Sequence, residues 1–173
     1  NTKHKLLGLY KVPNFLINLD ESFSNSLSKI KKINFDCLLT VDYGHGLITN
    51  KSLIKLHNKF KFKKNYLNLQ VNSSFSDKDY TYLFKKFDNF IFNKSEFKKL
   101  MKIENNDMIN KKIHNFISEY IVSNLVITSG FNGSYLYKKD KTIKHCPAFN
   151  SKAKDKIGAG DTFYSIFSIL DSL

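Results

Sequence analysis

The sequence contains no arginine and no tryptophan, and it has only two cysteines and two prolines among 173 residues. Cys37 and Cys146 are too isolated for a disulfide framework or a zinc site, and the five histidines include no pair at helical spacing. Cys37 lies in an apolar run and is interpreted as a small core residue. No apolar run approaches the roughly twenty residues needed to cross a membrane. These absences exclude a disulfide scaffold, a histidine–cysteine metal cluster and a spanning segment.

The basic character of the chain comes from lysine alone, with 28 lysines and a formal net charge of +13. Proteins that read nucleic acids use arginine for bidentate contacts, so the charge argues only weakly for a nucleic-acid-binding domain, which stays an unfavoured alternative. The lysine excess can steer anionic substrates toward a site. The chain starts at Asn1 without an initiator methionine or a secretory signal, so we expect a cytoplasmic protein entered in mid-sequence.

Short apolar runs alternate with helical patterns, which predicts one α/β domain with a mostly parallel sheet and helices on both faces. We expect buried strands at residues 35–41, 66–71, 90–92 and 125–128, and a hairpin at residues 134–137 and 142–145. The expected helices cover residues 20–34, a segment with the apolar face Leu53, Leu56, His57 and Phe60, a segment with the apolar face Ile109, Ile113, Phe116, Ile117 and Tyr120, and the C-terminal segment.

The C-terminal segment reads Asp155-Lys156-Ile157-Gly158-Ala159-Gly160-Asp161-Thr162-Phe163 and is the most informative part of the chain. Its small residues precede a helical pattern of apolar residues at Phe163, Ile166, Phe167, Leu170 and Leu173. The backbone N–H groups at such a helix start favour an anion, and glycine allows close approach. Asp161 would repel a phosphate unless it accepts a proton from an attacking hydroxyl. The alternative is an ordinary helix start with an acid in its first turn.

Two upstream segments complete a pattern: Asn93-Lys94-Ser95-Glu96, and Thr128-Ser129-Gly130-Phe131-Asn132-Gly133 at the end of an apolar run. Together with the C-terminal segment they resemble the PfkB-type (ribokinase-like) carbohydrate kinases. That family carries an Asn-x-x-Glu, a Thr-x-Gly-x-x-Gly and an Asp-Thr-x-Gly-Ala-Gly-Asp loop in the same order. Lys156, where the family has a small residue or threonine, and Ile166 depart from its pattern.

The resemblance implies a ribokinase-like three-layer sandwich and an ATP-dependent kinase that phosphorylates a hydroxyl of a sugar or sugar phosphate. It assigns Asp161 as the catalytic base and Gly158, Ala159 and Gly160 as the anion hole. The implied cofactors are ATP and Mg²⁺, with K⁺ or another monovalent cation left open.

For the nucleotide, the resemblance implies Asn93, Thr128, Gly130 and Gly133; for Mg²⁺ it implies Asn93 and Glu96, and for a monovalent cation Asp155. Each assignment has a structural alternative. An Asn can end a strand and a Glu can stand in a first helical turn, the glycines can serve a strand-to-hairpin turn, and Asp155 can cap the turn.

The segment Asp42-Tyr43-Gly44-His45-Gly46-Leu47 resembles the Asp-Tyr-Gly-Lys-Gly of heptose-phosphate kinases in ADP-heptose synthesis. It implies Asp42, Gly44 and Gly46 as substrate residues, with a tight turn as the alternative. The strand at residues 67–72 resembles an Asn-Thr-Gln-Thr-Asn strand of a related subgroup. Such enzymes often carry a nucleotidyltransferase domain, expected here outside this chain, and a homodimer is left open.

Residues 1–173 are expected to be the C-terminal, nucleotide-binding part of such a kinase, incomplete at both ends. In the family the sugar pocket and a β-sheet lid come mainly from the N-terminal half. A second hypothesis is a non-catalytic nucleotide-binding or regulatory module of the same fold, favoured only by Lys156 and Ile166.

Overall fold

The computed structural model describes residues 19–31, 34–43, 48–70, 79–149 and 158–173. In this part of the chain, six strands form one sheet in the order of the sequence. The strands are β1 (Asn34–Asp42), β2 (Lys61–Leu69), β3 (Asn89–Asn93), β4 (Asn124–Thr128), β5 (Ser134–Lys138) and β6 (Ile143–Cys146).

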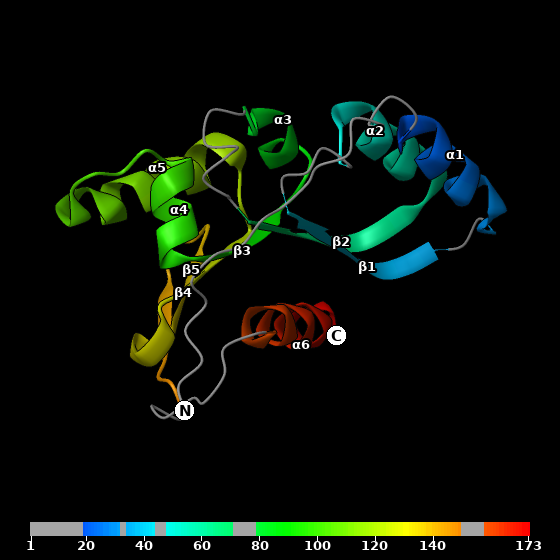
Figure 1. Ribbon diagram of the computed structural model, residues 1–173. Helices are drawn as coiled ribbons and strands as arrows, with labels where there is room; N and C mark the ends of the chain where they lie inside the picture. The colour runs from blue at the N-terminus through cyan, green and yellow to red at the C-terminus, as the bar shows by residue number, and fades with distance from the viewer. Residues whose placement is uncertain (1–18, 32–33, 44–47, 71–78, 150–157) are drawn as a thin grey trace, which may run out of the picture.

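Helices cover both faces of this sheet (Figure 1). The helices are α1 (Leu19–Lys29), α2 (Asn50–Lys59), α3 (Thr81–Phe84), α4 (Lys94–Leu100), α5 (Ile109–Tyr120) and α6 (Ala159–Ser172), with short 3₁₀ turns at Asn106–Met108 and Gly130–Asn132. Figure 1 shows α1 to α5 on one face and α6 alone on the other, against β1 and β2. The predicted three-layer arrangement is confirmed. Among the helices described, none has the length and apolar character that a bilayer-spanning segment needs.

The first four strands run parallel, whereas β5 and β6 continue the sheet as an antiparallel hairpin. The parallel register pairs Asn93 at the end of β3 with Thr128 at the end of β4. Because parallel strands end at one edge, the loops that follow β1 to β4 all leave the sheet on the same side. This alignment places two of the sequence motifs next to each other.

The strands alternate their apolar side chains between two cores, as expected for residues with a period of two. In β3, Phe90 and Phe92 face the core beneath α2 to α5, and Ile91 faces the smaller core beneath α6. Aromatic rings dominate the larger core: Phe116 lies within 5.1–5.8 Å of Phe84, Phe90 and Phe97, ring centre to ring centre. These edge-to-face contacts between aromatic rings help to stabilise the larger core.

Two predicted boundaries were wrong. The helix expected at 20–34 ends at Lys29, and Asn34 already belongs to β1. The strand expected from Tyr66 begins five residues earlier at Lys61, where exposed lysines alternate with half-buried side chains and Lys63 pairs with Asp36 on β1 at 2.6 Å. The lysines hid a period-two strand whose charged side faces solvent. The short helix α3 was not predicted.

The first strand was expected to be buried, but most of its side chains are only half-buried. Within the described residues β1 pairs with β2 alone and forms an edge of the sheet. Thr40 and Asp42 are its buried residues. Cys37 is half-buried and packs against the core beneath α6, so its interpretation as a core residue is only partly met.

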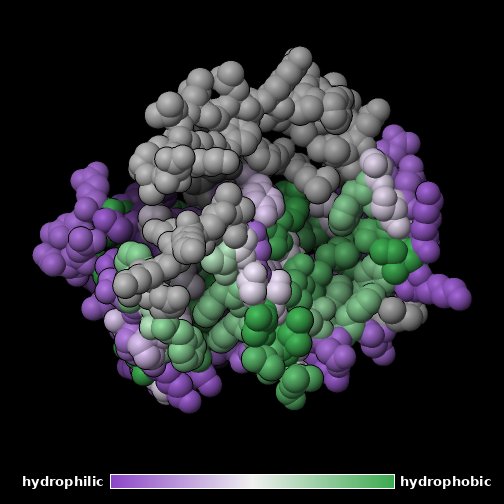
Figure 2. Space-filling model, turned by 60° about the horizontal axis from the view of Figure 1, so that its bottom comes forward, coloured by the Kyte–Doolittle hydropathy of each residue, from purple (hydrophilic) through white to green (hydrophobic). Residues whose placement is uncertain are grey.

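The predicted apolar face of α6 was also wrong in part. The helix buries Tyr164 and Ser168 and half-buries Phe163 and Phe167, while Ile166, Leu170 and Leu173 are 53%, 64% and 97% exposed. Figure 2 shows apolar residues gathered on this outer side of the molecule. The orientation depends on hydrogen bonds as well as on apolar packing, because Tyr164 and Asp171 of α6 find partners in the sheet while Phe163 and Phe167 pack against it.

The far end of α6 is held by Asp171. Its Oδ2 accepts hydrogen bonds from the Tyr66 hydroxyl at 2.7 Å and from Asn124 Nδ2 at 3.3 Å, and it pairs with Lys64 at 3.2 Å. Asn124 Nδ2 also contacts Asn89 Oδ1 at 3.0 Å, which ties three strands to the helix end. Burial, and next Asp171, raise the pKa of Tyr66, so its hydroxyl keeps its proton.

His57 on α2 gives the fold a predicted sensitivity to acid. Its ring lies edge-on to Phe62 and Phe87, and its buried Nε2 has no hydrogen-bond partner among the described residues. Burial, and next Lys86, lower the pKa of His57 below 6.5, against the smaller opposing effect of Asp88. The unfolded chain therefore binds a proton more readily, and stability falls as the pH drops below about 6.5.

We expect the melting temperature of the full-length protein to fall between about pH 7.5 and about pH 5.5, and the fall to be smaller in His57→Phe. Thermal unfolding followed by circular dichroism measures it. His114→Phe, at an exposed position on α5, is the matched control and should leave the pH dependence unchanged. An identical pH dependence in wild type and His57→Phe would contradict the assignment.

Candidate active site

The motifs are numbered in chain order: residues 93–96, 128–133 and 155–161. The first motif forms the junction of β3 and α4. The Asn93 side chain caps the helix: its Oδ1 accepts hydrogen bonds from the Glu96 N–H at 2.8 Å and from Ser95 Oγ at 2.7 Å. In return Glu96 Oε2 accepts from the Asn93 N–H at 2.9 Å, which completes a capping box. The structural alternative for this motif is therefore realised. The same box also fixes the Glu96 carboxylate at the edge of the sheet, and only Oε2 takes part in it.

The electrostatics of Glu96 link it to the third motif. Burial raises the pKa of Glu96; the Asn93 N–H and Lys99 lower it, and Asp161 raises it further. The influence of Asp161 means that two carboxylates of distant sequence motifs lie close enough to repel each other. A cation between them would relieve this repulsion.

The third motif begins α6. Gly158 adopts a left-handed conformation at φ 75°, and because it has no side chain it cannot itself cap the N–H groups that follow it. Asp161 stands exposed in the first helical turn, where the Thr162 N–H donates to the Gly158 carbonyl at 2.9 Å. N–H groups at a helix start attract anions, so this turn is compatible with the anion site expected from the sequence, which stays a prediction.

The glycines of the motifs are needed for different structural reasons. Gly158 is required by its backbone conformation, and Gly133 by packing, since a Cβ there would lie 2.0 Å from the Cys146 carbonyl oxygen. Gly133 therefore also fits the alternative of a strand-to-hairpin turn. At Gly160, by contrast, a Cβ would meet no atom within 4 Å, and no left-handed conformation demands glycine. Among the described residues, neither packing nor backbone conformation requires glycine at position 160.

The three motifs meet in one cavity of about 110 Å³ at the carboxyl edge of the sheet. Its wall contains Asn93 and Glu96 from the first motif, Thr128 from the second, and Gly160 and Asp161 from the third. Asn68, Gln70, Ile91, Phe92 and Phe163 complete the lining. Asn93 and Asp161, which are 68 positions apart in the sequence, thus line the same small polar space.

A second, larger cavity of about 320 Å³ adjoins the first, sharing Thr128, Gly160 and Phe163. It adds the glycines of the second motif and the end of the hairpin. Its remaining lining residues are Gly130, Gly133, Ser134, Cys146, Pro147, Ala148, Phe149 and Ala159. Together the cavities offer a polar compartment beside a more apolar one.

Sequence reasoning missed several lining residues. Cys146 and Phe149 line the larger cavity because Ser134 pairs with Cys146 in the hairpin, and no sequence motif predicted this pairing. Asn68 and Gln70 fall in the segment 67–72 that resembled a family strand, but neither was chosen as a site residue. Phe149 lines the larger cavity and is 99% exposed, and no pattern in the sequence indicated either property.

Not every predicted residue joins these cavities. Asp42 is 3% exposed at the carboxyl end of β1 and lines neither of them. Its neighbours Gly44 and Gly46, and Asp155 of the third motif, lie outside the described residues. The substrate and monovalent-cation assignments therefore stay predictions.

The donor set of the smaller cavity is made of oxygens, from the carboxylates Glu96 and Asp161 and from neighbouring amides. Hard cations such as Mg²⁺ prefer oxygen ligands and retain several waters. In the part of the chain that the structure describes, no three His, Cys, Asp or Glu side chains gather as a metal site. The residues therefore fit Mg²⁺ shared with phosphate oxygens and water, rather than a closed protein cage.

Comparison with solved structures finds the same architecture at low sequence identity. A ribokinase from Arabidopsis thaliana aligns with a TM-score of 0.62 and 18% identity over 79% of this chain and 43% of its own. The ribokinase of Thermotoga maritima gives 0.60 and 24% over 86% and 46%. A double mutant of fructokinase from Vibrio cholerae gives 0.63 and 14% over 85% and 49%. These likenesses establish the ribokinase-like α/β fold.

An uncharacterized sugar kinase of Buchnera aphidicola is 35% identical over 77 residues, which is 44% of this chain and 24% of that protein. The chain spans less than half the length of this relative and of the three solved structures. Residues 31–168 match the family described as pfkB family carbohydrate kinase, a range that contains all three motifs. The chain belongs to the PfkB family of carbohydrate kinases.

Proposed function

We propose that this chain is the nucleotide-binding part of a kinase that transfers the γ-phosphoryl group of ATP to a hydroxyl of a sugar or sugar phosphate. The observation that carries the proposal is the convergence of Asn93, Glu96, Thr128, Gly160 and Asp161 on one cavity. A small-residue helix start alone has a structural explanation. That explanation does not account for a helix start that shares a polar cavity with the Glu96 carboxylate and the end of a second strand.

In the proposed reaction the acceptor hydroxyl oxygen attacks the γ-phosphorus, and the bond from that phosphorus to the oxygen retained by ADP breaks. The hydroxyl proton passes to the Asp161 carboxylate, and ADP leaves with the electron pair. Backbone N–H groups at the start of α6 stabilise the charge on the transferred phosphoryl oxygens. Little proton transfer is needed early in such a loose transition state, so an ordinary carboxylate suffices as base.

The larger cavity suits the rest of the nucleotide. Thr128, which lines both cavities, and Gly130, which lines the larger one, would approach the phosphates. The exposed Phe149 ring offers a face on which a base can stack. The Arabidopsis ribokinase of the same fold was solved with ribose and ATP, which supports the choice of nucleotide.

Mg²⁺ fits beside Glu96 and Asn93, where it would neutralise charge on the bridging phosphates when bound. The capping box holds the Glu96 carboxylate toward this position before the nucleotide arrives. A monovalent cation near Asp155 is part of the proposal. The Vibrio cholerae fructokinase, solved with fructose, ADP and a potassium ion, supports it.

For the acceptor we propose a heptose phosphate or a similar sugar phosphate, on the likeness of residues 42–47 to that subgroup. Asp42 stands at the carboxyl end of β1, on the same edge of the sheet as the motifs. The net charge of +13 favours an anionic acceptor over a neutral sugar.

The test of the base assignment is Asp161→Asn in the full-length protein. We expect kcat to fall by roughly 100- to 10,000-fold, because the amide cannot accept the hydroxyl proton, while ATP still binds. A coupled assay for ADP formation with a panel of sugars and sugar phosphates measures turnover, and calorimetry measures ATP binding.

Asp107→Asn is the matched control, because it removes an exposed carboxylate on a distant 3₁₀ turn. Near-normal turnover in Asp161→Asn would overturn the base assignment. ATP binding by the wild type without transfer to any acceptor would favour the non-catalytic module.

Gly160→Ala separates the needs of the ligand from those of the fold. The added methyl meets open space, and alanine raises helix propensity by up to about 1 kcal/mol, so the melting temperature should hold or rise. We expect kcat/KM for ATP to fall by about 10- to 100-fold, since the methyl displaces the phosphate from the backbone. Unchanged kinetics would show that no phosphate approaches this residue.

Glu96→Gln tests the metal assignment without breaking the helix cap, since glutamine can still accept the Asn93 N–H. We expect the Mg²⁺ concentration for half-maximal activity to rise by about 10-fold or more. In the wild type, the apparent affinity for Mg²⁺ should also fall as the pH drops through the raised pKa of Glu96, because protons compete with the cation for the carboxylate.

Glu104→Gln, at an exposed position after α4, is the control and should alter neither property. An unaltered Mg²⁺ requirement in Glu96→Gln would remove this residue from the metal site.

A further inference from the structure

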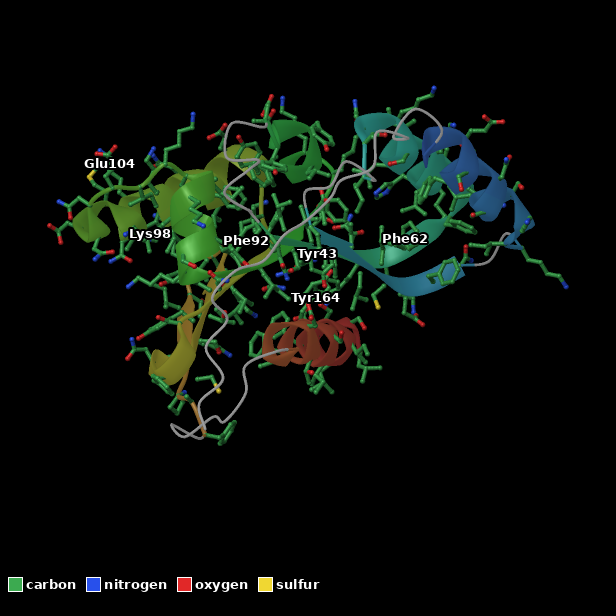
Figure 3. All side chains as sticks on the ribbon, in the orientation of Figure 1. Tyr43, Phe62, Phe92, Lys98, Glu104 and Tyr164 are labelled. Atoms are coloured by element: carbon green, nitrogen blue, oxygen red, sulfur yellow. The ribbon has the colours of Figure 1, made fainter. Side chains whose placement is uncertain are left out.

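The hydroxyl of Tyr164 bridges the backbones of two strands from within α6. It accepts a hydrogen bond from the Thr40 N–H on β1 at 2.8 Å, and it lies 2.8 Å from the Tyr66 carbonyl on β2 and 3.1 Å from that of Thr40. The side chain is 2% exposed and rises from α6 into the sheet (Figure 3). Burial raises the pKa of Tyr164, so the hydroxyl keeps its proton and donates it to a carbonyl.

This bridge has a definite place relative to the proposed site. On α6, Tyr164 follows Asp161 by three residues, about one helical turn or 4.5 Å along the axis. On β1, Thr40 precedes Asp42 by two residues, and Asp42 begins the segment proposed to bind the acceptor. A single phenol thus joins the helix that carries the proposed base to the strand that leads to the proposed acceptor loop.

The Tyr164 hydroxyl bonds to backbone atoms of the edge strand β1, so these bonds fix the distance between α6 and that strand. The β1 backbone is held on its inner side by β2, and among the described residues no strand lies beyond it. Without the hydroxyl, the Thr40 N–H and the Tyr66 carbonyl would lose their shared partner. The strands and α6 would then settle at a different spacing.

We propose that Tyr164 is a positioning residue that sets the distance between the base Asp161 and the acceptor-binding end of β1. The inference rests on the proposed kinase function and assigns Tyr164 no contact with ATP or the acceptor. Proper alignment of reacting groups controls rate strongly, and a misplacement of about 1 Å can cost roughly 100-fold.

The chain offers a matched control for this phenol. Tyr66 is fully buried and donates its hydroxyl to Asp171 Oδ2 at 2.7 Å, at the far end of the same helix. Asp171 follows Asp161 by ten residues, about 15 Å along the axis. Tyr164→Phe and Tyr66→Phe each remove one buried phenolic hydroxyl between α6 and the sheet, so both should lower the melting temperature.

In the full-length protein, Tyr164→Phe should lower kcat by about 10- to 100-fold with KM for ATP changed by no more than about twofold. Hydrolysis of ATP by water needs no positioned acceptor, so the ratio of ATP hydrolysed to acceptor phosphorylated should rise. Tyr66→Phe should leave kcat and this ratio near the wild-type values. A Tyr164→Phe enzyme with wild-type kcat per folded molecule, or a matching loss in Tyr66→Phe, would overturn the inference.

Amide hydrogen exchange gives a readout that does not depend on the acceptor. The Thr162 N–H, bonded to the Gly158 carbonyl, reports on the turn that carries Asp161. Its exchange should accelerate about 10-fold or more in Tyr164→Phe and stay unchanged in Tyr66→Phe. Equal exchange in both variants would refute the positioning role. If the wild type phosphorylates no acceptor, the proposed function fails, and the exchange result still decides whether Tyr164 orders this turn.

Discussion

The parallel alignment of β1 to β4 is the constraint on which the rest of the molecule depends. It brings the ends of the strands to one edge, so that Asn93 and Thr128 become neighbours although 35 positions separate them. The start of α6 closes the same edge from the opposite face of the sheet. A cavity lined by two carboxylates, amides and the start of α6 follows from this geometry together with the loop conformations that Gly133 and Gly158 allow.

The position of α6 is controlled by polar contacts together with the packing of Phe163 and Phe167 against the sheet. The hydroxyl of Tyr164 connects the helix to backbone atoms of β1 and β2, and the hydroxyl of Tyr66 on β2 bonds to Asp171 of the helix. Buried hydrogen bonds are directional, and leaving one unmade costs about 1–3 kcal/mol, so they select one rotation of the helix about its axis. The resulting orientation leaves Ile166 and Leu170 exposed and directs Gly160 and Asp161 into the cavity.

Much of the fold and of the site could be read from the sequence, because short apolar runs and glycine motifs have local causes. The order of the strands, the hairpin and the meeting of three motifs were predictable, whereas the short helix α3 was not. The early start of β2 was not, since lysines on its solvent side masked the alternation. The burial face of α6 and the lining residues Cys146 and Phe149 depend on partners distant in sequence, which periodicity does not encode.

The most direct test of the account is an amide NMR titration of the full-length protein with Mg²⁺ and ATP. The account predicts that the largest shifts fall on Gly160, Asp161, Thr128 and Gly130, whose backbone borders the two adjoining cavities. Shifts that cluster elsewhere and leave the start of α6 unperturbed would contradict the central claim that this edge of the sheet receives the phosphates.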